Sequence, residues 1–174
     1  MRKAAAPKTG VPSEPDWRGF LGFVLFVIGV SVVYGICHDL VTASVNKAYF
    51  LPPIHPIIIN TNSPVVLALF WGVIATWWAG LIFGGIIGYA NIAGPKPSLP
   101  WRQLKRQIAI ILPAIWVTAM IVLAGIYLYY RKQGEDDARI IAVATTHNWS
   151  YLLTTIYAIF MTFQVRQKRK NQKK

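Results

Sequence analysis

The side chains best suited to chemistry in this chain are three histidines and one aspartate: His38, Asp39, His55 and His147. Imidazole nitrogens and a carboxylate oxygen together suit a divalent transition metal, and the same groups can relay protons near neutral pH. The histidines lack the close, regular spacing of helical metal motifs such as H-x-x-x-H. A metal ligated by some or all of these four residues is therefore one hypothesis, and a proton site is another.

Further polar side chains surround the last histidine. His147, Ser150, Tyr151 and Thr154 follow helical spacing, so they share one helix face. We therefore predict an outward-facing polar pocket, and its candidate residues are His38, Asp39, His55, His147, Ser150 and Tyr151. The simpler interpretation is that these groups only make hydrogen bonds between helices or cap a helix end. No cofactor is predicted other than the transition metal that this donor set would suit.

Enzymatic signatures do not occur in the sequence. The chain has no G-x-S-x-G, H-E-x-x-H, P-loop or dinucleotide-binding pattern. Of its six acidic residues, only Asp39 stands beside a histidine within an apolar context, so a mechanism that needs paired carboxylates has no second member. No catalytic residue is assigned, and the sequence does not favour an enzyme.

Four long apolar runs must position the polar residues. They cover residues 19–37, 64–90, 107–130 and 140–164, and none contains Lys, Arg, Asp or Glu. Each approaches or exceeds the roughly 20 residues that an α-helix needs to cross a bilayer. Only 14% of the residues are charged, against about 25% in soluble domains. The predicted fold is an all-α, integral membrane four-helix bundle over residues 19–165, with an outer-face interfacial segment at 38–63.

The basic residues predict how this bundle is oriented. Most of the 18 Lys and Arg residues lie in the tail 1–18, the connection 91–106 and the tail 166–174. The segments between the other ends of the apolar runs hold only Lys47, Arg131, Lys132 and Arg139. The positive-inside rule then places both termini and the connection 91–106 in the cytoplasm. We expect residues 1–18 to be a disordered tail and the basic tail 166–174 to contact anionic lipids.

Small residues predict close helix packing. Ser31 and Gly35 are four residues apart, and Gly80, Gly84 and Gly88 repeat at the same interval, so each set exposes backbone along one helix face. Two functions follow. The first, preferred on sequence grounds, is an accessory subunit that packs against another membrane protein or a second copy. The second is a small transporter or a metal- or proton-binding membrane protein that uses the outer pocket. No specific nucleic-acid partner is expected.

Several stretches resemble a group of small four-span bacterial inner-membrane proteins. They are Tyr34-Gly35-Ile36, Asp39, Val41-Thr42-Ala43, Tyr49-Phe50, His55-Pro56, the run from Trp71 to Trp78, and the run from His147 to Tyr151. The resemblance extends over residues 20–165. It implies a bacterial origin and the four-span layout. The group has no assigned activity, so the resemblance implies no mechanism.

Overall fold

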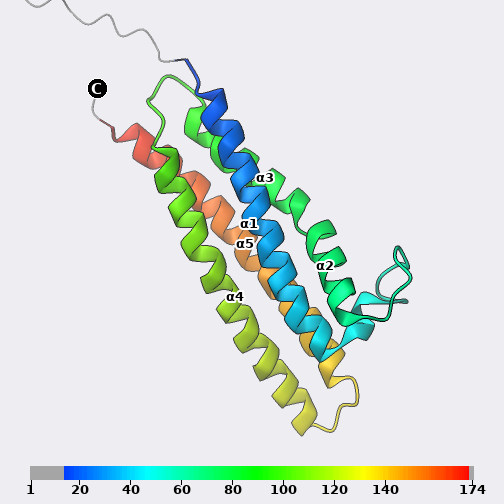
Figure 1. The fold of residues 1–174 in the computed structure, drawn as a ribbon. Helices are drawn as coiled ribbons and strands as arrows, with labels where there is room; N and C mark the ends of the chain where they lie inside the picture. Colours follow the sequence, from blue (N-terminus) through cyan, green and yellow to red (C-terminus); the bar gives the residue numbers. More distant parts are fainter. Residues whose placement is uncertain (1–13, 173–174) are drawn as a thin grey trace, which may run out of the picture.

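The computed structural model describes residues 14–172, which fold without any β-strand in that part of the chain (Figure 1). The α-helices are α1 (Trp17–Val45), α2 (Pro64–Ile74), α3 (Trp77–Ile92), α4 (Trp101–Lys132) and α5 (Ala138–Lys170), and a short 3-10 helix, η1 (Lys47–Phe50), follows α1. The predicted all-α bundle is confirmed. Residues 1–13, most of the predicted N-terminal tail, lie outside the described residues.

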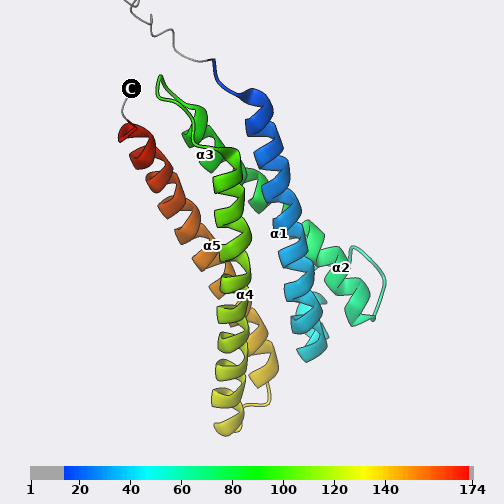
Figure 2. The same cartoon turned by 60° about the vertical axis from the view of Figure 1, so that its left-hand side comes forward.

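The α-helices form a bundle of four rods, in which α2 and α3 together make the second rod. Each rod runs antiparallel to the one before it in the chain (Figures 1 and 2). α1 packs against both α2 and α3, α4 packs against α5, and α3 also contacts α5. The start of α1, the loop 93–100 and the end of α5 lie at one end of the bundle (Figure 1). Residues 46–63 and the loop 133–137 lie toward the other end.

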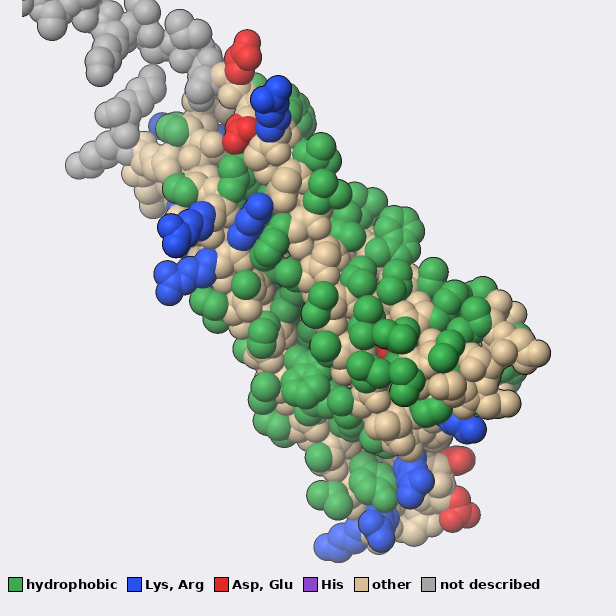
Figure 3. Space-filling model, in the orientation of Figure 1, with side chains coloured by type: hydrophobic (Ala, Val, Ile, Leu, Met, Phe, Trp, Pro, Cys, Tyr) green, Lys and Arg blue, Asp and Glu red, His purple; other side chains and the backbone are tan. Residues whose placement is uncertain are grey.

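Three of the rods are long and apolar enough to cross a membrane: Trp17–Val45, Pro64–Ile92 and Trp101–Lys132. Large apolar side chains cover the outside of the bundle, and basic groups gather toward its two ends (Figure 3). These features identify a membrane protein. α5 is not among the three rods because its middle carries polar residues such as Thr146 and Ser150, which are buried inside the bundle. A fourth span at 140–164 remains a prediction.

Two helix boundaries differ from the expected layout. α1 continues past residue 37 to Val45, because His38, Asp39, Thr42 and Ala43 face the bundle and are buried there. His38 and Asp39 therefore lie within a helix and not at its end. The second apolar run is broken at Ala75–Thr76, where the hydroxyl of Thr76 donates a 2.5 Å hydrogen bond to the carbonyl of Gly72.

The small residues selected from the sequence lie where α1 crosses the second rod. A Cβ atom added to Gly80 would lie 2.8 Å from the Cα of Ile28, and one added to Gly88 would lie 2.9 Å from the Phe20 ring. Ser31 also faces Gly80, and Gly84 faces Val24 and Val27, while Gly35 packs on the backbone of Gly72. The predicted glycine face is thus covered by α1 of the same chain.

The close approach at Gly80 predicts a stability difference within one helix. Gly80→Ala should lower the free energy of unfolding by about 1–3 kcal/mol, because the new methyl group would push the backbone of α1 away. Gly85→Ala is the matched control, since nothing lies within 4 Å of its added Cβ, and it should gain about 0.5–1 kcal/mol from helix propensity. Unfolding titrations in mixed detergent micelles measure both. Equal effects of the two substitutions would contradict this packing.

Arg169 closes the end of the bundle that holds the termini. Its side chain is 5% exposed, and its guanidinium donates hydrogen bonds to the carbonyls of Ala90, Ala93, Gly94, Lys96 and Pro97. They include the carbonyl of Ala90 in the last turn of α3 and that of its C-cap residue Ala93, where a positive charge is favourable. Arg169 therefore lies apart from the basic residues predicted to contact lipid, of which Arg166, Lys168 and Lys170 are exposed.

Asp16 and Asn91 hold the same end together. The Asp16 carboxylate caps α1 by accepting from the Gly19 N–H at 2.8 Å, and it accepts from the Trp101 indole N–H of α4 at 2.7 Å. These two bonds hold the pKa of Asp16 below its ordinary value, so the carboxylate remains ionised at neutral pH. The buried amide of Asn91 bonds both the N–H and the carbonyl of Leu99, which fixes the loop 93–100 against α3.

Replacing Arg169 should loosen this loop selectively. Lysine keeps the charge but presents one point donor in place of the planar fork, so Arg169→Lys cannot bond carbonyls on several sides at once. Each lost bond to a charged donor is worth about 1.5–3 kcal/mol, which predicts at least about tenfold faster exchange of the Leu99 amide, whose N–H bonds the side chain of Asn91. Hydrogen-exchange mass spectrometry measures this rate. Arg166→Lys, at an exposed position, is the control and should leave the loop unchanged.

Candidate functional site

Three of the four residues proposed as metal ligands meet between α1 and α5. His38 and Asp39 come from α1 and are 3% and 4% exposed, and His147 comes from α5. The Nε2 atom of His147 lies 3.1 Å from Oδ1 of Asp39. One donor atom from each residue can be chosen so that all three lie within 4.8 Å of one another. We call His38, Asp39 and His147 the triad.

The hydrogen bonds of His147 constrain what the triad can hold. Its Nδ1 lies 2.9 Å from the carbonyl of Val143, and a carbonyl can only accept, so Nδ1 carries a proton. The other nitrogen, Nε2, faces a carboxylate oxygen of Asp39. Two lone pairs would repel each other at this distance. A positively charged species, either one proton or a metal ion, must therefore lie between the two atoms.

His38 is the unusual member of the triad. Neither of its ring nitrogens has a hydrogen-bonding partner among the described residues, although the side chain is almost fully buried. Its ring contacts the rings of Tyr34, at 5.7 Å between centroids, and His147, at 4.6 Å. Burying an imidazole without partners is unfavourable. Packing alone therefore does not account for a histidine at this position, because both ring nitrogens would stay unpaired at a cost in free energy.

His55 does not join the triad. Its Nδ1 lies 2.6 Å from the carbonyl of Tyr49, and its ring packs on Trp71 at 4.7 Å in the outer segment. The Tyr49 ring contacts both His55, at 5.0 Å, and His147, at 4.6 Å. Phe50 lies 5.8 Å from His147 and is 2% exposed. Residues 47–55 therefore form an aromatic cover beside the triad, and His55 belongs to that cover.

The charge of Asp39 affects the ionisation of Tyr49 in the aromatic cover. Burial raises the pKa of the Tyr49 hydroxyl above its ordinary value, and the nearby carboxylate of Asp39 raises it further. Tyr49 is therefore neutral at physiological pH. It contributes an uncharged aromatic face against His147.

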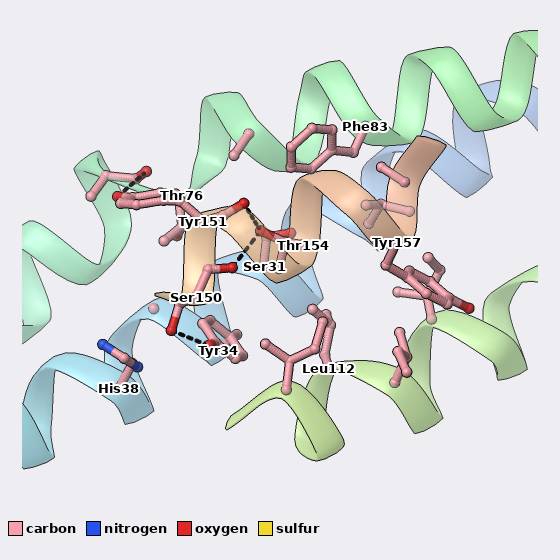
Figure 4. Close-up of a pocket in the computed structure, with 18 of the residues that line it drawn as sticks. Ser31, Tyr34, His38, Thr76, Phe83, Leu112, Ser150, Tyr151, Thr154 and Tyr157 are labelled. Carbon is pink, nitrogen blue, oxygen red and sulfur yellow. Dashed lines mark hydrogen bonds between the residues drawn. The ribbon is translucent and has the colours of Figure 1, made fainter. Parts of the chain in front are cut away.

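A cavity of about 80 Å³ adjoins the triad between α1, α3, α4 and α5. Figure 4 shows His38 toward one end and Tyr157 toward the other, with Tyr34 and Ser150 pointing at each other. The Tyr34 hydroxyl donates to Ser150 Oγ at 2.9 Å, and Ser150 donates to the Thr146 carbonyl at 3.0 Å. The predicted residue Tyr151 also lines the cavity.

The size of the cavity limits its contents. Sites for drug-sized ligands enclose about 300–1,000 Å³. One water needs about 10–15 Å³ on this scale, so the cavity has room for a few waters or an ion. Away from the triad its walls are apolar and include Phe83, Ile87, Ile108 and Leu112. The space is therefore too small for a large organic substrate.

The helix break borders the same cavity. Ala75 and Thr76 line it, and the Tyr151 hydroxyl donates to the carbonyl of Ala75 at 3.5 Å. Sequence reasoning missed this break and the role of Tyr34. The position of Tyr34, one helical turn before His38, was a usable signal. The break had no such signal, because Ala75 and Thr76 are ordinary residues within an apolar run.

Comparisons with known proteins add nothing to this description. No family model, no curated protein and no solved structure matches the chain. The assignment of a function therefore depends on the geometry of the triad and its cavity.

Proposed function

We propose that this chain is a small multi-pass membrane protein that binds a cation, a metal ion or a proton, in its membrane domain and acts as a transporter or ion-binding protein. The observation that carries the proposal is the environment of Asp39. Among residues 14–172, its only ion-pair partner is His147, and no Lys or Arg lies within salt-bridge distance. A carboxylate buried in this way requires a bound cation to compensate its charge.

The position of the triad supports the same proposal. Ionisable residues inside a membrane are energetically costly, and they usually mark ion paths, proton relays or ligand sites. Asp39 and His147 lie on rods that are expected to cross the bilayer, and they face the interior of the bundle. This arrangement allows a cation to be held away from lipid.

The broken second rod gives independent support. Irregular backbone within a membrane is tolerated where it is buried in protein or lines a cavity, and transporters use such breaks at their ion sites. The break at Ala75–Thr76 lines the cavity that adjoins the triad. Backbone carbonyls near the break would add oxygen dipoles to a cation path.

The topology assigned to the bundle sets the direction of access. With both termini in the cytoplasm of a bacterial inner membrane, the ends of α1 and α5 that carry the triad lie in the outer half. The aromatic cover of residues 47–55 then lies between the triad and the outside. Arg166, Lys168 and Lys170 remain free to contact anionic lipids of the inner leaflet.

The accessory-subunit alternative has lost its main structural argument. That alternative relied on a glycine face able to accept another helix and on the outer segment 38–63 as a docking surface. Gly80 and Gly88 already accept α1 of the same chain. A partner protein or a second copy would have to use the lipid-facing surface, where nothing distinguishes a docking site from ordinary contact with lipid. The geometry therefore favours cation binding.

Removing the charge of Asp39 tests the proposal. In purified full-length protein, at least one cation from a panel of alkali, alkaline-earth and transition-metal chlorides should stabilise the wild type, by about 2.7 kcal/mol at 100 times its Kd. Asp39→Asn should abolish that stabilisation because the amide cannot compensate a cation. Thermal unfolding with choline chloride as the salt control measures the effect. Asp136→Asn, in the exposed loop 133–137, is the matched control.

A second experiment tests the case in which the bound cation is a proton. Proteoliposomes containing the wild type should show a flux of protons or of the identified cation, read with a pH- or ion-sensitive dye, that Asp39→Asn reduces. Identical behaviour of wild type and Asp39→Asn in both the unfolding and the vesicle measurements would overturn the proposal.

A further inference from the structure

We infer that His38, Asp39 and His147 form an exchangeable site for a divalent transition metal of the zinc type. The inference rests on the proposed cation-binding function and names the class of cation. It uses a feature that proton binding does not explain, the unpartnered imidazole of His38.

The distances fit a metal centre with little rearrangement. With bonds of about 2.0–2.1 Å, two ligands of a tetrahedral zinc ion lie roughly 3.3 Å apart. The Nε2 atom of His147 and Oδ1 of Asp39 are already 3.1 Å apart. The donor atoms of the whole triad lie within 4.8 Å of one another, so His38 must approach by roughly 1.5 Å.

His38 supplies the second line of argument. Both of its ring nitrogens lack partners while the side chain is 3% exposed, and its ring lies edge-on to His147 with 4.6 Å between centroids. A shared proton between Asp39 and His147 would leave both nitrogens of His38 unpaired. A metal ion uses one of them as a ligand.

His147 already has the outer hydrogen bond that a metal ligand usually has. Ligating histidines commonly donate their second N–H to a carbonyl or carboxylate, which fixes the tautomer and directs the other lone pair at the metal. The Val143 carbonyl accepts from Nδ1 of His147 at 2.9 Å. The lone pair of Nε2 therefore points toward Asp39, where the metal would lie.

The number of ligands indicates an exchangeable site. Structural zinc sites are closed by four protein ligands, whereas three protein ligands leave a position for water or a transported species. Within the described residues, the triad is the cluster of three metal-binding side chains that the structure brings together. The cavity of about 80 Å³ beside it can supply the fourth ligand as water.

The donor types select among metals. Two imidazoles and one carboxylate suit Zn²⁺, Co²⁺, Ni²⁺ or Cu²⁺, whereas Mg²⁺ and Ca²⁺ require sets of oxygen ligands. One carboxylate also neutralises only part of the charge of a divalent ion. The buried complex keeps a positive charge, which favours release over permanent retention.

Cobalt binding to the detergent-purified full-length chain tests the inference. Co²⁺ should bind with one ion per chain and give the intense visible absorption of a four-coordinate site, and Zn²⁺ should displace it while Mg²⁺ and Ca²⁺ do not. His38→Gln and His147→Gln should each weaken Zn²⁺ binding by at least about 100-fold, more than loss of an outer-shell partner usually costs. His55→Gln is the matched control, and it should leave the affinity unchanged.

A measurement on the unaltered protein covers the case in which a variant fails to fold. X-ray absorption of the Zn²⁺-loaded wild type should show two histidine nitrogens at about 2.0–2.1 Å. Three results would overturn the inference. Zn²⁺ binding could be weakened equally by His55→Gln, it could be unchanged by substitution of any of the three histidines, or the bound metal could show no histidine ligands.

The tests of the two proposals give separable results. A response to an alkali ion or a proton that depends on Asp39, without Co²⁺ or Zn²⁺ binding at the triad, overturns the metal inference and leaves the proposed function standing. Absence of any Asp39-dependent cation effect overturns both.

Discussion

The absence of water in the hydrocarbon layer is the constraint on which the rest of this structure depends. Every polar group at that depth must find its partner within the chain. Inside the bundle, hydroxyl groups along α5 are satisfied locally, since Thr146 and Thr154 donate to the carbonyls four residues before them. Asp39 and His147 meet this requirement across the bundle, with each other. Among the described residues His38 finds no such partner, and for that reason it is the most informative residue of the site.

Close packing of α1 against the second rod makes the site geometrically possible. Glycines at the crossing remove the side chains that would hold the two backbones apart, so that Gly35 and Gly72 meet backbone to backbone. The rod is broken just beyond that contact, at Ala75–Thr76, and Tyr151 of α5 bonds the carbonyl of Ala75. The same crossing therefore brings α1, the break and α5 to one cavity.

The two ends of the bundle are built differently. At the end that holds the termini, Asp16, Asn91 and Arg169 tie the helix starts and the loop 93–100 together with hydrogen bonds to backbone groups. At the other end, the aromatic rings of residues 47–55 pack over the triad without a comparable network of charged contacts. Aromatic packing is less directional than charged hydrogen bonding.

The sequence by itself determined the all-α bundle and its apolar rods, because bilayer thickness and backbone hydrogen bonding leave a long apolar run few alternatives. It also named His38, Asp39 and His147 as candidates, together with His55, since ionisable groups are rare within and beside such runs. Only the tertiary structure decided that these three side chains lie close together while His55 packs against Tyr49. It also decided that α1 covers the glycine face and that the second rod breaks at Ala75–Thr76. These outcomes depend on contacts between residues far apart in the chain, 108 positions for Asp39 and His147, which no local pattern encodes.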